Sequence, residues 1–309
     1  MRHTAPIALF VYNRLQHTQQ VVTALKENHL SQDSELYIFA DAPRHTGAAP
    51  EVELVRNYLN SITGFKEVHI CLRQSNLGVD ENIMQGVTEV IGKHGKAIVI
   101  EDDLVTSPWF LEYMNEALDF YEHKEEVASI HGYLLPISQK MESAFFLRGA
   151  DCWGWATWKR AWDLFERDGS SLLEQIEKRG LQKEFDFNNA YPYFNALKQQ
   201  AIGNTKEWDI RWYASMFLAE KLTLYPAQSL VKNIGHDASG EHCGTSDVFD
   251  VQLSESPIAV EVPVVHSKAA FQAFSLFLKY LSSITFPQKS WLSRSFRNVK
   301  NLGAKLLTR

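Results

Sequence analysis

Lys96-Ala97-Ile98-Val99-Ile100-Glu101-Asp102-Asp103-Leu104 joins a short apolar run to three consecutive acids. An apolar run rich in β-branched residues is typical of a strand that is buried on both faces of a sheet. Adjacent carboxylates at the end of such a strand repel one another unless water or a cation compensates their charge. Oxygen ligands of this kind suit Mg²⁺ or Mn²⁺. A solvated acidic turn that leads into the next helix is the alternative that this stretch leaves open.

The chain on both sides of this stretch alternates between strand-like and helix-like segments. Strands are expected at residues 7–12, 35–40, 68–72, 97–100 and 127–130, and helices at 18–28, 51–62, 82–91 and 109–123. Strands that alternate with helices of about ten residues form βαβ units and a mostly parallel sheet. We therefore expect an α/β fold of the doubly wound, Rossmann-like type, with helices flanking a central sheet.

Polar residues follow four of these strands at the point where each strand ends. They are Asn13 and Arg14, then Asp41, then Asn76, and finally Glu101, Asp102 and Asp103. Ligands of open α/β sheets bind beyond the carboxyl ends of the strands, so these residues are expected to share one site. The chain lacks GxGxxG, GxxxxGK[ST] and GxSxG motifs, which argues against a dinucleotide site, a P-loop and a hydrolase nucleophile elbow.

A cluster of tryptophans opens the second half of the chain. Trp155, Trp158 and Trp162 have the i, i+3, i+7 spacing that predicts one face of a helix, and we expect core packing for the last two. Trp153 and Gly154 precede this segment and are expected to form a floor on which a sugar ring packs. Residues 170–200 are predicted to be a polar, helical lid or insertion on the acceptor side.

Two later segments carry further titratable groups. Glu207-Trp208-Asp209 opens a predicted helix, for which Asp209 could serve as the N-cap. The loop at residues 233–244 is rich in glycine and contains His236 and His242. These histidines either contact a metal or phosphate or belong to an ordinary surface loop.

Taken in their order along the chain, the strand-end motifs and the later segments resemble those of the GT-A fold glycosyltransferases. The resemblance is greatest to the β-1,2-N-acetylglucosaminyltransferase I family and its bacterial, family 2-like relatives. Glu101-Asp102-Asp103-Leu104, with Pro108-Trp109 after it, resembles the EDD motif and following helix start of that family. Gly154-Trp155, Trp208-Asp209 and the loop at residues 235–244 resemble its later segments. The resemblance spans roughly residues 5–245, and the segment between Trp162 and Trp208 departs from it.

The resemblance implies inverting, metal-dependent transfer of a sugar, with a UDP-sugar as the expected donor. The expected acceptor is a hydroxyl of a glycan or a lipid-linked saccharide, as in bacterial surface polysaccharide synthesis. By the same resemblance, Asp103 and His242 ligate Mn²⁺ or Mg²⁺, and Asp209 is the base, with Glu207 as its rival. The remaining donor contacts are assigned to Asn13, Arg14, Asp41, Asn76, Glu101, Asp102, Trp153 and Gly154.

Two other function classes remain open at this point. One is a carbohydrate- or nucleotide-binding protein without turnover. The other is a sugar-phosphate nucleotidyltransferase, which would be expected to have a glycine-rich, basic loop after the first strand. Residues 13–17 contain no glycine, which argues against that second class.

The charge is segregated along the chain. The net charge is −6, yet no Asp or Glu follows Glu261, and that tail carries eight cations: Lys268, Lys279, Lys289, Arg294, Arg297, Lys300, Lys305 and Arg309. We expect residues 263–309 to form a basic amphipathic segment that lies on an anionic membrane or packs on the acidic body. Residues 1–262 are the expected catalytic domain, with a nucleotide-binding half at 1–130 and an acceptor half at 131–262.

Three isolated cysteines, no signal peptide and no long apolar run suggest a reducing compartment. We therefore expect a cytoplasmic protein, peripheral at the inner face of the plasma membrane, without a nucleic-acid partner.

Overall fold

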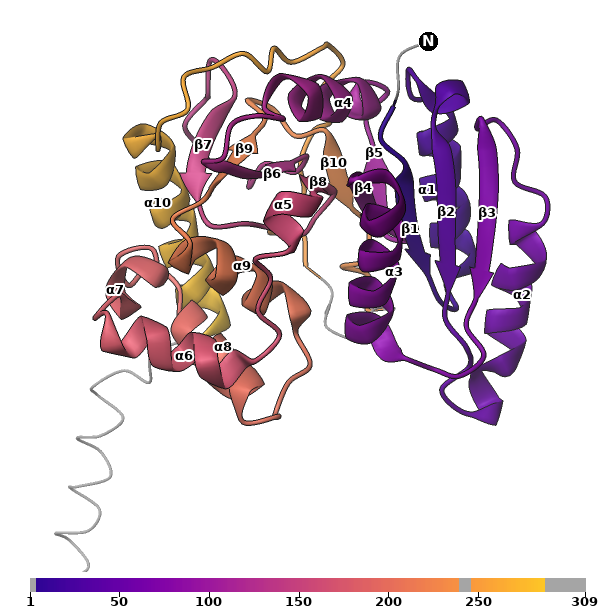
Figure 1. Cartoon of the computed structure of the whole chain (residues 1–309), viewed down its shortest axis with the longest axis horizontal. Coiled ribbons are helices and arrows are strands. Elements are labelled where there is room, and N and C mark those ends of the chain that lie inside the picture. Colours follow the sequence, from indigo (N-terminus) through magenta and orange to yellow (C-terminus); the bar gives the residue numbers. More distant parts are fainter. Residues whose placement is uncertain (1–3, 239–245, 287–309) are drawn as a thin grey trace, which may run out of the picture.

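A mixed eight-stranded sheet runs through the computed structural model, which describes residues 4–238 and 246–286 (Figure 1). Its strand order is β3-β2-β1-β4-β8-β6-β9-β7. The strands are β1 (Ile7–Val11), β2 (Glu35–Ala40), β3 (Glu67–Leu72), β4 (Lys96–Glu101), β6 (Val127–His131), β7 (Phe145–Arg148), β8 (Trp155–Trp158) and β9 (Leu222–Tyr225). The α/β fold expected from the sequence is confirmed.

The first four strands pair in parallel, in the order β3-β2-β1-β4. Their crossovers contain α1 (Leu15–Lys26), α2 (Ala49–Leu59) and α3 (Gly78–His94). Apolar residues of α1 and α2 join one core cluster and those of α3 join another, so the helices cover opposite faces of the sheet. Burial on both faces explains why β1, β2 and β4 read as continuous apolar runs, whereas the edge strand β3 is only half-buried.

The tryptophan segment departs from the prediction. Trp155 and Trp158 belong to β8, not to a helix, and only the short α5 (Lys159–Trp162) follows. This strand lies antiparallel between β4 and β6 and thereby joins the two halves of the sheet. Trp155 packs in one core cluster and Trp158 in the other, because residues three apart in a strand face opposite sides. The predicted burial of Trp158 and Trp162 is confirmed.

Residues 170–200 form a small helical layer. It consists of α6 (Gly169–Lys178), α7 (Gln182–Phe185) and α8 (Tyr193–Ala201). Buried residues such as Leu172, Phe185 and Leu197 pack them in a third core cluster with residues of α9 (Trp208–Leu218) and α10 (Lys268–Thr285). The layer lies beside the sheet, at the lower left in Figure 1.

The acidic stretch ends in a second, two-stranded sheet. β5 (Leu104–Thr106) pairs antiparallel with β10 (Val231–Asn233), and α4 (Phe110–Phe120) follows β5. This pairing brings the start of the 233–244 loop to Asp103, whose carbonyl accepts a hydrogen bond from the Ile234 N–H at 2.8 Å. This contact joins segments about 130 residues apart, and both segments line the cavity described below.

Candidate active site

The pairing of β1 with β4 builds the centre of the site. Phe10 pairs with Glu101, so the residues that follow β1 lie beside those that follow β4. The Arg14 guanidinium forms ion pairs with the carboxylates of Asp102 and Asp103, the latter at 3.0 Å. Its Nη1 atom is buried and has no partner among the described residues. Although burial opposes the charge, the two carboxylates raise the pKa of Arg14 above its ordinary value.

The acidic triplet carries more negative charge than Arg14 neutralises. Burial raises the pKa of Glu101 well above its ordinary range, and the charges of Asp103 and Asp102 raise it further. Burial also raises the pKa of Asp102, with Arg14 opposing that shift. Three carboxyl groups share one guanidinium, and the raised pKa values of Glu101 and Asp102 reflect the cost of ionising all three together.

Gly235 and His236 lie on the side of the cavity formed by Asp103. Gly235 lies so close that a Cβ on it would overlap the Asp103 carboxylate. His236 lines the same cavity, and its buried Nε2 has no partner in the described part of the chain. Burial lowers the pKa of His236, which favours the neutral imidazole that metals bind. His242, predicted to be a ligand, lies outside the described residues.

Asp41 organises the loop that follows β3. Its carboxylate accepts hydrogen bonds from the backbone N–H groups of Leu77 and Gly78, both at 2.9 Å, and from the Asn76 side chain at 3.0 Å. Leu77 and Gly78 begin α3, where unpaired N–H groups and the helix dipole favour a negative charge. Asp41 therefore holds Asn76 and the start of α3 in place at the cavity.

Asp209 lies in the first turn of α9 and lines the cavity. Glu207 occupies the N-cap position, so the alternative that Asp209 is the N-cap is wrong. Burial, and then the charge of Glu207, raise the pKa of Asp209 to about 6. The Cys152 thiol donates to its Oδ2 at 3.8 Å.

A hydrogen bond from the other half of the chain positions this helix. Asp80, in α3, accepts from the Trp208 N–H at 3.1 Å and forms an ion pair with Arg211 at 3.2 Å. The indole of Trp208 stacks on Trp155, with ring centroids 5.6 Å apart. Asp209 therefore lies on a buried helix that aromatic packing and the contacts of Asp80 hold in place. These contacts fix the position of the Asp209 carboxylate relative to the ends of the strands.

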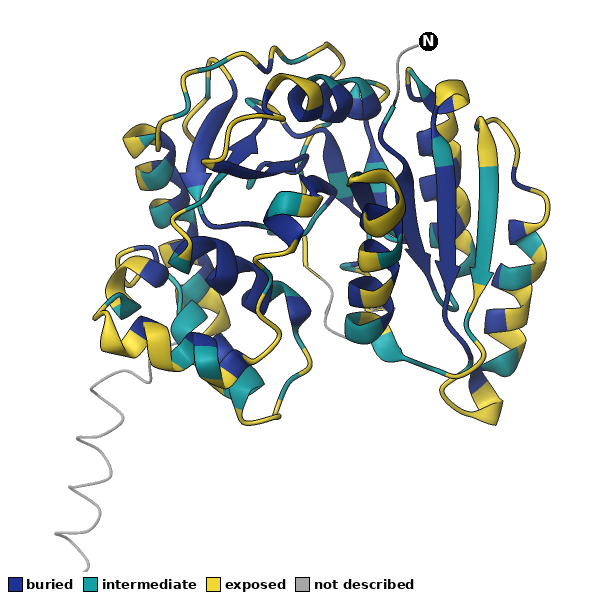
Figure 2. Ribbon diagram, viewed as in Figure 1, coloured by how far each residue is buried: buried dark blue, intermediate teal, exposed yellow. Residues whose placement is uncertain are grey.

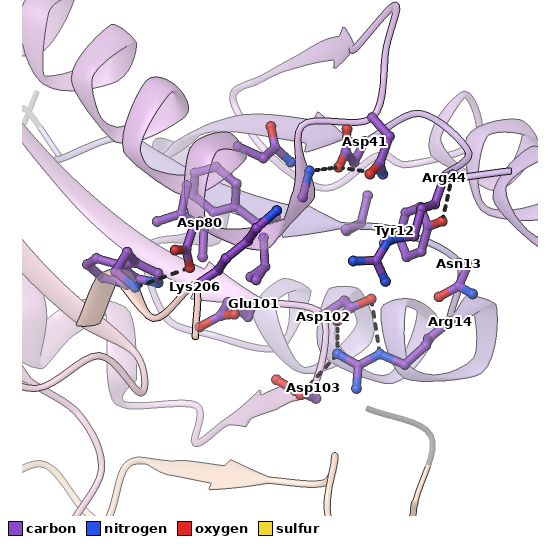
Figure 3. Close-up of a pocket in the computed structure, with 18 of the residues that line it drawn as sticks. Tyr12, Asn13, Arg14, Asp41, Arg44, Asp80, Glu101, Asp102, Asp103 and Lys206 are labelled. Carbon is purple, nitrogen blue, oxygen red and sulfur yellow. Dashed lines mark hydrogen bonds and ion pairs between the residues drawn. The ribbon is translucent and has the colours of Figure 1, made fainter. Parts of the chain in front are cut away.

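These groups line one cavity of about 810 Å³, shown in Figure 3. Nine of the predicted site residues line it: Asn13, Arg14, Asp41, Asn76, Glu101, Asp102, Asp103, Trp153 and Asp209. Gly154 is not among the lining residues; it has a φ of +67°, and a Cβ there would overlap Val231. The ring of Trp153 packs against His236 and Phe249.

The sequence did not single out several lining residues. They are Tyr12, Arg44, Asp80, Cys152 and Lys206. Figure 3 shows Lys206 extending into the cavity, and Arg44 lying near Tyr12, whose hydroxyl accepts from the Arg44 N–H at 3.0 Å. Arg44 was discoverable, because it follows β2 as Arg14 follows β1. Lys206 had no such signal, since it lies in a polar segment far from the strand ends.

Comparisons with known proteins give no family. No family model matches the chain, and no curated protein matches it. Solved structures match parts of it at 10–13% identity with TM-scores of 0.32–0.38. Because these scores lie below 0.5, function must be argued from the site itself.

Three of these structures illustrate the range. The Staphylococcus aureus TarS structure with UDP-GlcNAc is 12% identical, with 45% of this chain and 39% of that chain covered and a TM-score of 0.32. TarS 1–349 is 10% identical, with 73% and 59% covered and a score of 0.38. A candidate nucleotide-diphospho-sugar transferase from Desulfovibrio desulfuricans is 12% identical, with 53% and 68% covered and a score of 0.34. The match covers only 24% of another TarS chain.

Proposed function

We propose that this protein is a glycosyltransferase that moves a sugar from a nucleotide-diphosphate donor to an acceptor hydroxyl. One observation carries the proposal. A single cavity joins a buried guanidinium and an acidic triplet at the strand ends to a buried carboxylate, Asp209, on the acceptor side. Its volume of about 810 Å³ is within the range of small-molecule sites.

The strand-end side of the cavity suits the diphosphate of the donor. The unpartnered Nη1 of Arg14 and the Lys206 side chain are cationic donors that lie at the cavity. Asp103 and His236 would hold Mn²⁺ or Mg²⁺. When bound, such a cation neutralises charge that develops on the diphosphate leaving group. Asp41 contributes by positioning Asn76 and the start of α3 against the donor.

The acceptor side supplies the base. Asp209 accepts the proton of the acceptor hydroxyl, whose oxygen attacks the anomeric carbon of the sugar. The bond from that carbon to the diphosphate oxygen breaks, and the nucleoside diphosphate leaves with the electron pair. With a pKa of about 6, Asp209 is mostly ionised at neutral pH yet remains basic enough to accept a proton. One base opposite one leaving group corresponds to inversion at the anomeric carbon. We propose a glycan or a lipid-linked saccharide as the acceptor.

The test is nucleotide release by the purified full chain. UDP-, GDP-, dTDP- and CMP-sugars are supplied with Mn²⁺ or with a chelator, and saccharide acceptors are added in turn. We expect cation-dependent release with one nucleotide class. Asp209→Asn should abolish release while calorimetry still shows donor binding, and Asp163→Asn, an exposed site that pairs with Lys159, serves as the matched control.

Other outcomes identify the alternatives. Donor binding without release under any condition would indicate a binding protein. Pyrophosphate formation from a nucleoside triphosphate and a sugar phosphate would indicate a nucleotidyltransferase. If no nucleotide-sugar binds, the proposed function is wrong.

A further inference from the structure

The inner face of α10 packs on the body of the protein. Ala270, Phe274, Leu278 and Leu281 are buried in the third core cluster. Phe274 packs edge-on against Phe145 and Tyr225 of the sheet, at centroid distances of 6.0 and 5.4 Å. This helix is therefore packed against the body of the protein through its inner face.

The outer face of the same helix exposes three large apolar side chains beside polar residues such as Gln272 and Lys279. Leu276, Tyr280 and Ile284 have exposed fractions of 67%, 55% and 48%. Their i, i+4, i+8 spacing aligns them in one stripe along the helix. A surface helix of a globular protein normally presents polar residues on this side. Figure 2 shows exposed segments along α10, at the edge of the molecule opposite β3.

Basic residues accompany the stripe, and acidic residues are absent from the same part of the sequence. Lys268 and Lys279 are exposed on α10 itself. The chain continues beyond Phe286 with six further cations, and no Asp or Glu occurs after Glu261. An apolar stripe flanked by uncompensated cations is complementary to a bilayer that contains anionic lipids.

We propose that the α10 stripe, formed by Leu276, Tyr280 and Ile284, docks this protein on an anionic lipid surface. A second copy of the chain fits less well. A two-fold contact through the stripe would bring the Lys279 residues of the two copies close together, and like charges there would oppose association. A lipid headgroup layer supplies the opposite charge, and its acyl boundary receives the apolar side chains.

The docked face lies next to the acceptor side of the cavity. The ring of Phe286, just beyond α10, is 6.1 Å from that of Tyr191, and Tyr191 lines the cavity. Docking would therefore hold the cavity rim near the membrane. On the proposed function, and only on it, this position favours an acceptor whose saccharide is carried by a lipid. None of the helices in the described ranges has the length and apolarity needed to cross a bilayer.

Vesicle flotation of the full chain tests the docking without requiring donor, acceptor or activity. Vesicles of phosphatidylcholine alone are compared with vesicles that also contain phosphatidylglycerol. The stripe variant carries Leu276→Ser, Tyr280→Ser and Ile284→Ser. Leu54→Ser is the matched control, because Leu54 is 56% exposed on α2, outside the stripe. We expect flotation only with anionic vesicles, a loss of partitioning of about tenfold or more in the stripe variant, and no change in the control.

Two further measurements keep the test decisive. Thermal unfolding establishes that the stripe variant is folded; if it is not, Lys279→Glu is used in its place and should also weaken flotation on anionic vesicles. Raised salt should reduce binding, because the attraction is partly electrostatic. The proposal is overturned if the full chain does not float with anionic vesicles or if a folded stripe variant floats equally well. It is also overturned if the stripe holds a dimer that does not bind lipid. Flotation without sugar transfer would support the docking and count against the proposed function alone.

Discussion

The pH dependence of transfer is the most direct test of the role of Asp209. A general base must be ionised to accept a proton, and the pKa of this carboxyl is raised to about 6 by burial and then by the charge of Glu207. Below pH 6 Asp209 is increasingly protonated, so the transfer rate should fall on the acid side. With one titrating group, about a tenth of the molecules are ionised at pH 5 and about nine-tenths at pH 7. The rate should therefore differ by about tenfold between these pH values.

Two substitutions distinguish Asp209 from its rival. Replacing Glu207 with Gln removes the second contribution to the raised pKa of Asp209. The fall in transfer rate at acid pH should then begin at a lower pH, while the maximal rate at neutral pH is retained. Replacing Asp209 with Asn removes the base, and the rate should fall by roughly 10²- to 10⁴-fold with donor binding retained. If Glu207 were the base instead, Glu207→Gln would abolish turnover and Asp209→Asn would not.

The assay is single-turnover transfer from pH 5 to pH 8, with saturating donor and acceptor, so that chemistry limits the rate. Thermal unfolding at each pH establishes that the protein remains folded. The control variant Asp163→Asn should show the same fall in transfer rate at acid pH as the wild type. The reasoning is refuted by a flat wild-type profile between pH 5 and pH 7, or by full turnover in Asp209→Asn.

Three further predictions concern the strand-end side of the site. Arg14→Ala leaves the triplet without its cation and should reduce the free energy of unfolding by about 2 kcal/mol, measured in urea, as well as weakening donor binding. Gly235→Ala should displace the Asp103 carboxylate and weaken Mn²⁺ affinity in calorimetry, whereas Gly92→Ala, where a Cβ meets no atom within 4 Å, should leave it unchanged. Asp41→Ala removes the acceptor of two backbone N–H groups at the start of α3 and should cost about 2 kcal/mol in urea unfolding; unchanged stability would argue against its anchoring role.

The strands in the first half of the chain, and the grouping of the polar residues at their ends, were predictable from the sequence. Strands buried on both faces of a sheet read as apolar runs, and βαβ units place their carboxyl ends at one edge. Asn13, Arg14 and the acidic triplet could therefore be grouped from their positions at strand ends. The ion pair between Arg14 and Asp103 follows from the pairing of β1 with β4. This pairing could not be predicted from the sequence of either strand alone.

The second half of the chain was less predictable because its segments depend on their surroundings. The spacing of Trp155, Trp158 and Trp162 satisfies a helical pattern, but Trp155 and Trp158 lie on opposite faces of a strand. Periodicity cannot distinguish these arrangements when both faces are buried. The polar segment at residues 170–200 likewise gave no sign that it packs against α10.

By itself, the sequence determined local structure and the residue types available for chemistry, since apolar runs and polar strand ends are properties of neighbouring residues. Only the tertiary structure decided which of those residues meet. The close approach of Gly235 to the Asp103 carboxylate depends on the pairing of β5 with β10, and the placement of Asp209 depends on Asp80 in a distant helix. Such contacts join segments that are far apart in the chain, and their formation depends on packing and strand pairing in the whole fold rather than on local propensity.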